Sequence, residues 1–300
     1  MESPTTAKAG PRVRGAEGVE LATFHLGGDG PPVIAVHATG FHGRCWGPLA
    51  MQLSPSLSVW AVDQRGHGAS GKAPSGRYDD WSLFVDDLFA VLDALGGDQP
   101  WRGIGHSMGG AVLLLAEARQ PGTFHDLCCY EPVVFPPTLA SSDGFGGRVP
   151  MAELARKRRP SFPSLQAAYD NYASKPPFAR LDPAALEAYV TFGFVDEPGG
   201  GVTLACARDD EASVFEGAPQ SGAWERLAEV RPPVTLLGGG DMTDPVSFAL
   251  EDVARRLPRG GVRRFADLDH FGPFEDPIQV GAVMAAALGG HGGPHDRLTP

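Results

Sequence analysis

Gly103-Ile-Gly-His-Ser-Met-Gly-Gly110 is the stretch that decides the fold of this 300-residue chain. An apolar run leads into Ser107, and an Ala/Leu-rich helical segment over 108–119 follows at once. A residue at the tip of so sharp a strand-to-helix turn has a strained backbone, and Cβ atoms on neighbouring residues would clash. Gly105 and Gly109 stand at the two positions where those Cβ atoms would lie. The stretch therefore predicts a turn that presents the Ser107 hydroxyl as a nucleophile.

Short apolar runs alternate with helical segments on both sides of this turn. The alternation is typical of a parallel α/β architecture, and the runs are apolar throughout because helices cover a parallel strand on both faces. The clearest other helix spans 81–95, where apolar residues form one stripe. The predicted strands cover 33–36, 57–62, 103–104, 127–130 and 234–237, with a mixed strand over 262–265 nearer the sheet edge and an antiparallel strand over 20–26.

The alternation stops between about residues 137 and 230. Helical pieces punctuated by proline and glycine replace it, and one of them begins with Asp182 as N-cap and Pro183 in its first turn. Because this segment lies between two core strands, we interpret it as an inserted helical cap. The predicted organisation is a core over 15–136 and 231–290, a cap over 137–230, and flexible termini over 1–14 and 291–300.

The charge and the apolar runs limit the partners that the chain can have. Acidic residues outnumber basic residues by 36 to 25, so the formal net charge is −11, and phosphate binding needs a basic face. The longest apolar stretch, 280–290, is shorter than the roughly 20 residues that cross a bilayer. Residues 1–14 hold no apolar signal segment. We therefore expect a cytoplasmic protein with a small-molecule substrate and neither nucleic acid nor membrane as partner. The sequence carries no signal for an oligomeric state.

Neither a metal nor a cofactor is expected. The cysteines are too few for a disulfide framework and lack the spacing of a zinc site, which predicts small buried side chains. His291 and His295 lie in a glycine-rich tail that would preorganise no metal site. The chain has no P-loop and no dinucleotide-binding pattern of glycines. The four cysteines are Cys45, Cys128, Cys129 and Cys206.

Four segments together resemble one known family. They are Val36-His-Ala-Thr-Gly-Phe41, Asp63-Gln-Arg-Gly-His-Gly-Ala-Ser70, the turn around Ser107, and Leu268-Asp-His-Phe-Gly-Pro273. From about residue 20 to 290 the chain resembles the α/β-hydrolases of the capped esterase/lactonase type. The resemblance implies an α/β-hydrolase fold, in which helices flank a mostly parallel sheet and a helical cap is inserted.

The resemblance also implies two donors for an oxyanion. In the family the loop after the strand that ends near Val36 reads His-Gly-X, and X supplies a backbone N–H. Carried over, that donor is Thr39, with Ala38 in place of the usual glycine, and the second donor is the N–H of Met108 at the helix N-terminus.

A serine hydroxyl needs a base, because the neutral group is a poor nucleophile at pH 7. The family order is serine, acid, histidine, so the base comes late in the chain. His270 follows the last predicted strand within a matching segment, whereas the other two late histidines lie in the tail. We therefore expect His270 to be the base.

The acid that orients His270 has three candidates. Two follow the strand over 234–237, where Asp244 fits a Gly-x-x-Thr/Ser-Asp form and Asp241 fits a Gly-x-x-Asp form. We favour Asp244, because the proline and helix downstream then fall in register. Glu131, at the end of the preceding strand, is an option that some relatives use, although a carboxylate that braces the cap entrance is the preferred interpretation there.

A serine nucleophile implies acyl transfer rather than the epoxide or halide chemistry of relatives with an aspartate at the turn. We expect a serine hydrolase that cleaves a small carboxylic ester or lactone through an acyl-enzyme. Two alternatives stay open: cleavage of a C–C bond or thioester by the same triad, and a small-ligand receptor without turnover. The sequence does not name the substrate.

Two features of the predicted cap bear on the substrate. Its aromatic residues could line a pocket, although packing within the cap explains them equally well. We interpret the basic run 156–159 as a solvated helix face. The alternative is that these residues steer anions toward the cap. The aromatic residues are Phe178, Tyr189, Phe192 and Phe194.

Overall fold

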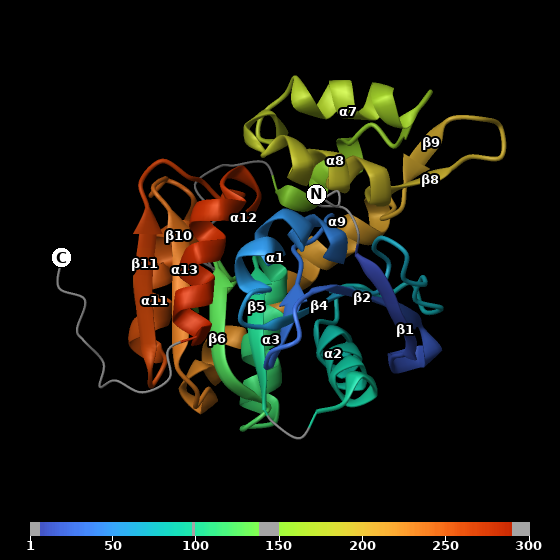
Figure 1. Cartoon of the computed structure of the whole chain (residues 1–300). Helices are drawn as coiled ribbons and strands as arrows, with labels where there is room; N and C mark the ends of the chain where they lie inside the picture. The colour runs from blue at the N-terminus through green and yellow to red at the C-terminus, as the bar shows by residue number, and fades with distance from the viewer. Residues whose placement is uncertain (1–6, 98–99, 138–149, 290–300) are drawn as a thin grey trace.

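A mostly parallel sheet runs through the molecule (Figure 1). The computed structural model describes residues 7–97, 100–137 and 150–289, and its large sheet has eight strands in the order β1-β2-β4-β3-β5-β6-β10-β11. The strands β3 to β6, β10 and β11 pair in parallel, whereas β1 and β2 are antiparallel to their neighbours. The strands are β1 (Lys8–Arg14), β2 (Glu20–Gly27), β3 (Pro32–Val36), β4 (Ser58–Asp63), β5 (Trp101–His106), β6 (Phe124–Tyr130), β10 (Val234–Gly239) and β11 (Gly260–Phe265).

Every strand that the sequence predicts is present. β2 is the antiparallel strand, and β11 lies at the sheet edge as expected. The sheet order, the flanking helices and the region inserted before β10 are those expected of an α/β-hydrolase fold.

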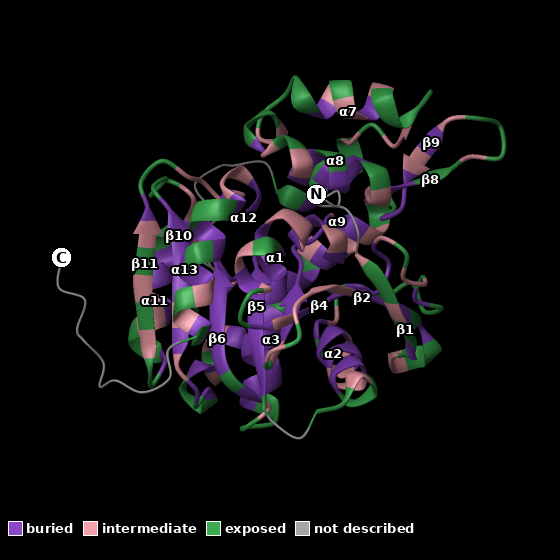
Figure 2. Cartoon of the chain, viewed as in Figure 1, coloured by how far each residue is buried: buried purple, intermediate pink, exposed green. Residues whose placement is uncertain are grey.

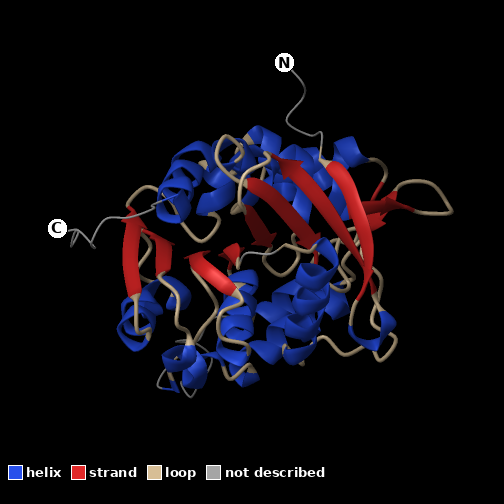
Figure 3. Ribbon diagram, turned by 60° about the horizontal axis from the view of Figure 1, so that its bottom comes forward, coloured by secondary structure: helices blue, strands red, loops and turns tan. Residues whose placement is uncertain are grey.

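Helices cover both faces of this sheet, as Figure 3 shows. Side chains alternate along a strand, so Ile34 and Val36 join one core cluster, with α2, α3 and α11, whereas Val33 and Ala35 join the other, with α1 and α13. In Figure 2 the central strands and most of α3 are coloured as buried. These helices are α1 (Gly47–Leu53), α2 (Ser82–Leu95), α3 (Met108–Arg119), α11 (Pro245–Arg256), the short α12 (Gly272–Glu275) and α13 (Pro277–Gly289).

Most of the described region between β6 and β10 lies over one end of the sheet (Figure 1). Asp182 caps α8 through the N–H groups of Ala184 and Ala185, as the sequence predicts. The region also contains a small antiparallel sheet in the order β7-β9-β8, which the helical interpretation did not include. Its elements are α6 (Met151–Lys157), β7 (Ser161–Phe162), α7 (Leu165–Ala173), α8 (Pro183–Gly193), β8 (Phe194–Asp196), β9 (Val202–Leu204), α9 (Arg208–Gly217) and α10 (Ala223–Arg226).

The limits of this insertion, 137–230, stay a prediction. Its last part, from Ala223 to Val230, packs into the hydrophobic cluster that contains α3. This stretch therefore belongs with the core in packing, although it precedes β10 in the chain.

The N-terminal segment differs from its expected flexibility. Lys8–Arg14 forms β1 at the sheet edge and pairs with β2. The register shifts between Ala9 and Arg12, and Thr23 Oγ1 donates to the Pro11 carbonyl at 2.7 Å. Gly10 and Pro11 interrupt any strand-like pattern in the sequence, which is why a bulged edge strand was not predicted. Residues 1–6 and the predicted C-terminal tail lie outside the described residues.

Two further expectations concern the cysteines and membrane spans. All four cysteines are buried and free. Among the described residues, no helix combines the length and apolar character that a membrane crossing requires.

A buried arginine ties the loop after β4 to α2. The Arg65 side chain is fully buried and donates to both carboxylate oxygens of Asp87, at 2.7 and 2.8 Å, and to Glu17 at 2.9 Å. His67 Nδ1 lies 2.9 Å from the Arg65 carbonyl oxygen. These contacts brace the loop after β4 against α2 and the N-terminal segment.

We expect Asp87→Ala to lower the free energy of unfolding by about 3–5 kcal/mol, because it leaves the Arg65 charge buried without its main partner. Urea unfolding followed by circular dichroism measures this. Asp86→Ala is the matched control, since Asp86 pairs with Arg119 at the surface, where such a pair contributes about 0–1 kcal/mol. Equal losses in the two variants would contradict the bracing role.

Candidate active site

Ser107 lies at the tip of the turn between β5 and α3. Its backbone has φ 55° and ψ −120°, a strained conformation for a residue with a side chain. A Cβ on Gly105 would lie 2.6 Å from Gly110 Cα, and one on Gly109 would lie 2.1 Å from the Val36 carbonyl oxygen. The glycines are therefore required on both sides of Ser107, for the steric reason that the sequence suggests.

The candidate residues converge at one edge of the sheet. Thr39, Ser107 and Glu131 follow the carboxyl ends of β3, β5 and β6, and Asp244 and His270 follow those of β10 and β11. Because these strands are parallel neighbours in one sheet, the loops after them meet. The topology thus gathers residues that are up to 231 positions apart, from 39 to 270.

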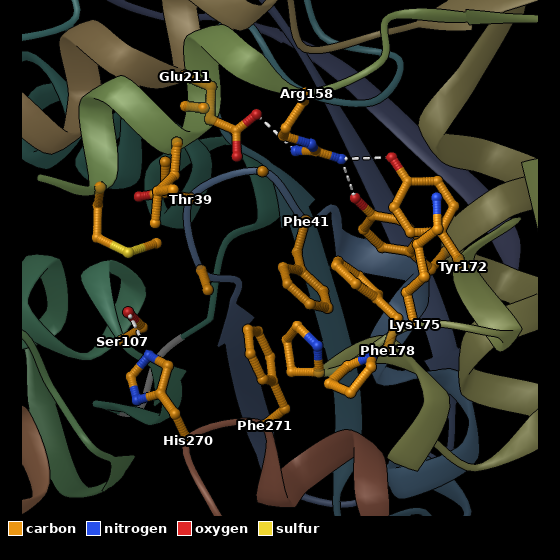
Figure 4. A pocket seen from close by; sticks show the side chains of 18 of the residues that line it. Thr39, Phe41, Ser107, Arg158, Tyr172, Lys175, Phe178, Glu211, His270 and Phe271 are labelled. Atoms are coloured by element: carbon orange, nitrogen blue, oxygen red, sulfur yellow. Dashed lines mark hydrogen bonds and ion pairs between the residues drawn. The ribbon is translucent and has the colours of Figure 1, made fainter. Parts of the chain in front are cut away.

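His270 lies against Ser107 (Figure 4). Its Nε2 is 3.1 Å from Ser107 Oγ, which is hydrogen-bonding distance. The His270 carbonyl oxygen is 2.7 Å from Nε2 of the buried His106, the residue before Ser107. His106 thus connects the histidine loop to β5, a contact that the sequence does not indicate.

The carboxylate in contact with His270 is Glu131. Its Oε2 lies 2.6 Å from His270 Nδ1, and its Oε1 accepts from the Gly239 N–H at 2.7 Å. The side chain is 1% exposed. Glu131 has φ 41°, so two of the residues in this array have a positive φ. Such strain concentrates at functional sites.

Asp244, the acid that the sequence favours, lies nearby in a different role. One carboxylate oxygen of Glu131, one of Asp244 and one ring nitrogen of His270 lie within 4.8 Å of one another. Asp244 Oδ1 accepts from the N–H groups of Val246 and Ser247 and so caps α11. Asp241 Oδ1 accepts from the N–H and hydroxyl of Thr243 in the exposed turn before it.

The register that favours Asp244 in the sequence does not decide which acid contacts His270, since all three acids follow strands that end beside it. The positive φ of Glu131 is a property of the folded backbone and leaves no mark in Tyr130-Glu131-Pro132.

Glu131 and His270 stabilise each other's charge. Burial lowers the pKa of His270, but the hydrogen bond and charge of Glu131, with smaller effects of Asp244 and Asp269, raise it above 6.5. Burial raises the pKa of Glu131, but the His270 hydrogen bond and charge and the Gly239 N–H bring it below 4.5. Glu131 is therefore ionised at neutral pH and favours a proton on His270.

Thr39, in the loop after β3, lies beside Met108, the first residue of α3. The Thr39 hydroxyl lies 3.6 Å from Met108 Sδ, and Thr39 is 7% exposed. Among the described residues, neither backbone N–H donates to a backbone or side-chain acceptor. The loop that carries Thr39 is braced by Gln64, whose N–H and side-chain amide bind His37 Nε2 and the His37 carbonyl oxygen at 2.9 and 2.7 Å. Two unpaired N–H groups at this place could bind an oxyanion.

A cavity of about 480 Å³ opens over Ser107 and His270. Phe41 stacks on Phe178 and Phe271, with ring centroids 6.0 and 5.5 Å apart, and forms its apolar wall (Figure 4). Of the cap aromatics, Phe178 and Tyr189 line the cavity. The other two pack elsewhere: Phe192 lies under Arg44 and Phe194 lies against Phe162.

A buried ion pair forms another wall of the cavity. Arg158 donates to Glu211 at 2.5 Å and to the hydroxyls of Tyr172 and Tyr189 at 2.9 and 2.5 Å (Figure 4). Nothing in the basic run 156–159 predicts this network, because four consecutive basic residues are typical of a solvated helix face. Arg158 is the member of that run that turns inward, with a side chain 18% exposed, whereas Arg156, Lys157 and Arg159 are exposed.

Comparison with known proteins gives consistent matches along the chain. The profile described as "Alpha/beta hydrolase family" matches residues 33–283. Lipase LipV of Mycobacterium tuberculosis is 36% identical over 279 residues, which are 90% of this chain and 98% of that protein. The human monoglyceride lipase is 31% identical over 131 residues, 41% of this chain and 43% of that protein.

Among solved structures, E-2-(acetamidomethylene)succinate hydrolase superposes with a TM-score of 0.79 over 95% of this chain and 100% of that chain. The sequence identity is 21%, so this likeness shows the fold alone.

We expect the His270 imidazole to titrate above pH 6.5, and Glu131→Gln to lower its pKa by about one pH unit or more, because the mutation removes the neighbouring charge. Histidine NMR titration measures both values. Asp241→Asn is the control and should leave the titration near that of the wild type. A larger decrease in Asp244→Asn than in Glu131→Gln would contradict the assigned partner.

Proposed function

Because this chain belongs to the alpha/beta hydrolase family and is a carboxylic ester hydrolase, we propose that Ser107, His270 and Glu131 cleave a small carboxylic ester or lactone through an acyl-enzyme. The observation that carries the proposal is the continuous chain of contacts from Ser107 Oγ to His270 Nε2, at 3.1 Å, and from His270 Nδ1 to Glu131 Oε2, at 2.6 Å. The acid is thus Glu131 in place of Asp244.

The first half of the reaction forms the acyl-enzyme. His270 Nε2 takes the proton of Ser107 as the oxygen attacks the carbonyl carbon of the ester. The carbonyl oxygen becomes an oxyanion, which the N–H groups of Thr39 and Met108 stabilise. Glu131 holds the tautomer with the proton on Nδ1 and stabilises the imidazolium that forms. The C–O bond to the alcohol then breaks, and His270 gives its proton to the departing oxygen.

The second half returns the enzyme to its starting state. Water enters where the alcohol stood, gives a proton to His270 Nε2, and attacks the carbonyl carbon. The second oxyanion occupies the same two N–H groups, the bond to Ser107 breaks, and His270 returns the proton to the serine oxygen. The carboxylic acid leaves, and neither metal nor cofactor takes part in the scheme.

The cavity supports a substrate with an apolar chain. Its walls near Ser107 are made by Phe41, Phe178 and Phe271, and its volume of about 480 Å³ is that of a small-molecule site. The names of the relatives, a lipase and a monoglyceride lipase, also point to esters of apolar acids. We therefore propose esters with a short to medium acyl chain as the preferred substrates, and lactones of similar size as their cyclic equivalents.

We expect Ser107→Ala to lower the hydrolysis of p-nitrophenyl butyrate by at least about 100-fold and to abolish labelling by a fluorophosphonate probe, because both reactions need the serine oxygen. Initial rates and in-gel fluorescence measure the two effects. Ser82→Ala, on the exposed start of α2, is the matched control and should retain both reactions. Unchanged rates in Ser107→Ala would remove Ser107 from the mechanism.

The two carboxylates should differ in their effect on turnover. We expect Glu131→Gln to lower kcat by at least about 100-fold, because the amide cannot stabilise the imidazolium, and Asp244→Asn to lower it by less than about tenfold. Steady-state rates with p-nitrophenyl butyrate measure both, and circular dichroism checks that each variant is folded. The reverse ranking would return the role of acid to Asp244.

A further inference from the structure

The side chains around the cavity carry a net positive charge, whereas the whole chain is negatively charged. The protein has 36 acidic and 25 basic residues, yet the cavity is lined by three basic residues, Arg158, Arg159 and Lys175, and by one carboxylate, Glu211. A local excess of positive charge in an acidic protein attracts anions to that place.

The inner part of the cavity is electrically balanced. Glu211 pairs with Arg158 at 2.5 Å, and the side chain of Glu211 is 7% exposed. The two tyrosine hydroxyls occupy further Arg158 donors. The pair also packs against Gly40, next to Thr39, where a Cβ would lie 2.6 Å from Glu211 Oε1. The interior therefore suits an uncharged chain rather than a buried anion.

The excess positive charge lies at the rim. Lys175 and Arg159 are both exposed and line the cavity. Lys175 Nζ donates to Asn171 Oδ1 at 2.6 Å, and Arg159 Nε donates to the Ser161 carbonyl oxygen while its guanidinium lies 4.3 Å from the Phe162 ring. Within the described ranges neither side chain forms an ion pair with a carboxylate. Figure 4 shows Lys175 beside Tyr172 and Phe178, across the cavity from Ser107 and His270.

We propose that the natural substrate is an ester whose acyl chain ends in an anionic group, a carboxylate or a phosphate, held at the rim by Lys175 and Arg159. The inference rests on the proposed function and adds the class of acid. The acyl chain is the part that must stay in the cavity, because it remains bonded to Ser107 while water replaces the alcohol. Its apolar middle then lies along Phe41 and Phe178, and its charged end reaches solvent and the two cations.

The test compares esters that differ only at the end of the acyl chain. p-Nitrophenyl hexanoate is the neutral member. The mono-p-nitrophenyl ester of adipic acid carries a terminal carboxylate, and the p-nitrophenyl ester of 6-phosphonooxyhexanoic acid carries a terminal phosphate. We expect wild-type kcat/KM to be higher for at least one anionic ester than for the neutral ester. The ratio of kcat/KM for that anionic ester to kcat/KM for the neutral ester should fall about three- to fivefold in Lys175→Gln and further in the double variant with Arg159→Gln. Of the two anionic members, the one with the larger loss identifies the group. Raised salt should shrink the wild-type ratio.

Lys157→Gln is the matched control. It removes the same charge from the exposed end of α6, where Lys157 faces Glu153 at 3.6 Å and does not line the cavity. The ratio should stay at the wild-type value in this variant. A ratio that falls equally in Lys157→Gln and Lys175→Gln would overturn the inference, and so would a ratio that neither rim variant changes.

A binding measurement separates this inference from the proposed function. Ser107→Ala protein is titrated by calorimetry with monomethyl adipate and with methyl hexanoate, which needs no turnover. Tighter binding of monomethyl adipate that is lost in Ser107→Ala/Lys175→Gln supports the rim site, and equal binding of both esters overturns it. The loss of neutral-ester hydrolysis in Ser107→Ala tests the proposed function alone.

Discussion

The close approach of α3 to the end of β3 is the constraint on which the site depends. Gly109 lies so near the Val36 carbonyl oxygen that a Cβ there would be 2.1 Å from it, and Gly105 approaches Gly110 in the same way. Ser107 has a positive φ at this approach, and the loop after β3 lies beside the start of α3. One packing contact thus places the proposed nucleophile and both proposed N–H donors.

The site also depends on the carboxyl ends of four neighbouring strands, which lie beside that contact. β5, β6, β10 and β11 are parallel neighbours, so Ser107, Glu131 and His270 meet although each comes from a separate loop. Buried contacts hold each loop in place: His106 binds the His270 carbonyl oxygen, and Gly239 binds Glu131. A carboxylate that is almost fully buried and bonded through both oxygens keeps one orientation, which suits the task of fixing an imidazole.

The inserted region completes the cavity without contributing to the proposed triad. It supplies Phe178 and Tyr189, which complete an aromatic wall that Phe41 and Phe271 of the core begin, and also the balanced pair of Arg158 and Glu211 and the cations at the rim. The core thus holds the residues of the proposed triad, and the insertion holds all the charged side chains of the cavity lining other than His270. Fold alone does not fix a substrate, so the residues that line the cavity matter most for the choice of ester.

The sequence by itself determined seven strands of the large sheet, the fold class and the resemblance to the family, because strand-forming runs, Gly105 and Gly109 express local requirements that any chain with this turn must meet. It also singled out Ser107 and His270, whose neighbours carry the family's motifs. The tertiary structure alone decided which acid touches His270, since Glu131, Asp241 and Asp244 all follow strands that end at this edge and only packing distinguishes them. It likewise turned Arg158 inward out of a basic run and added β1 at the edge, because burial and strand pairing depend on residues far away in the chain.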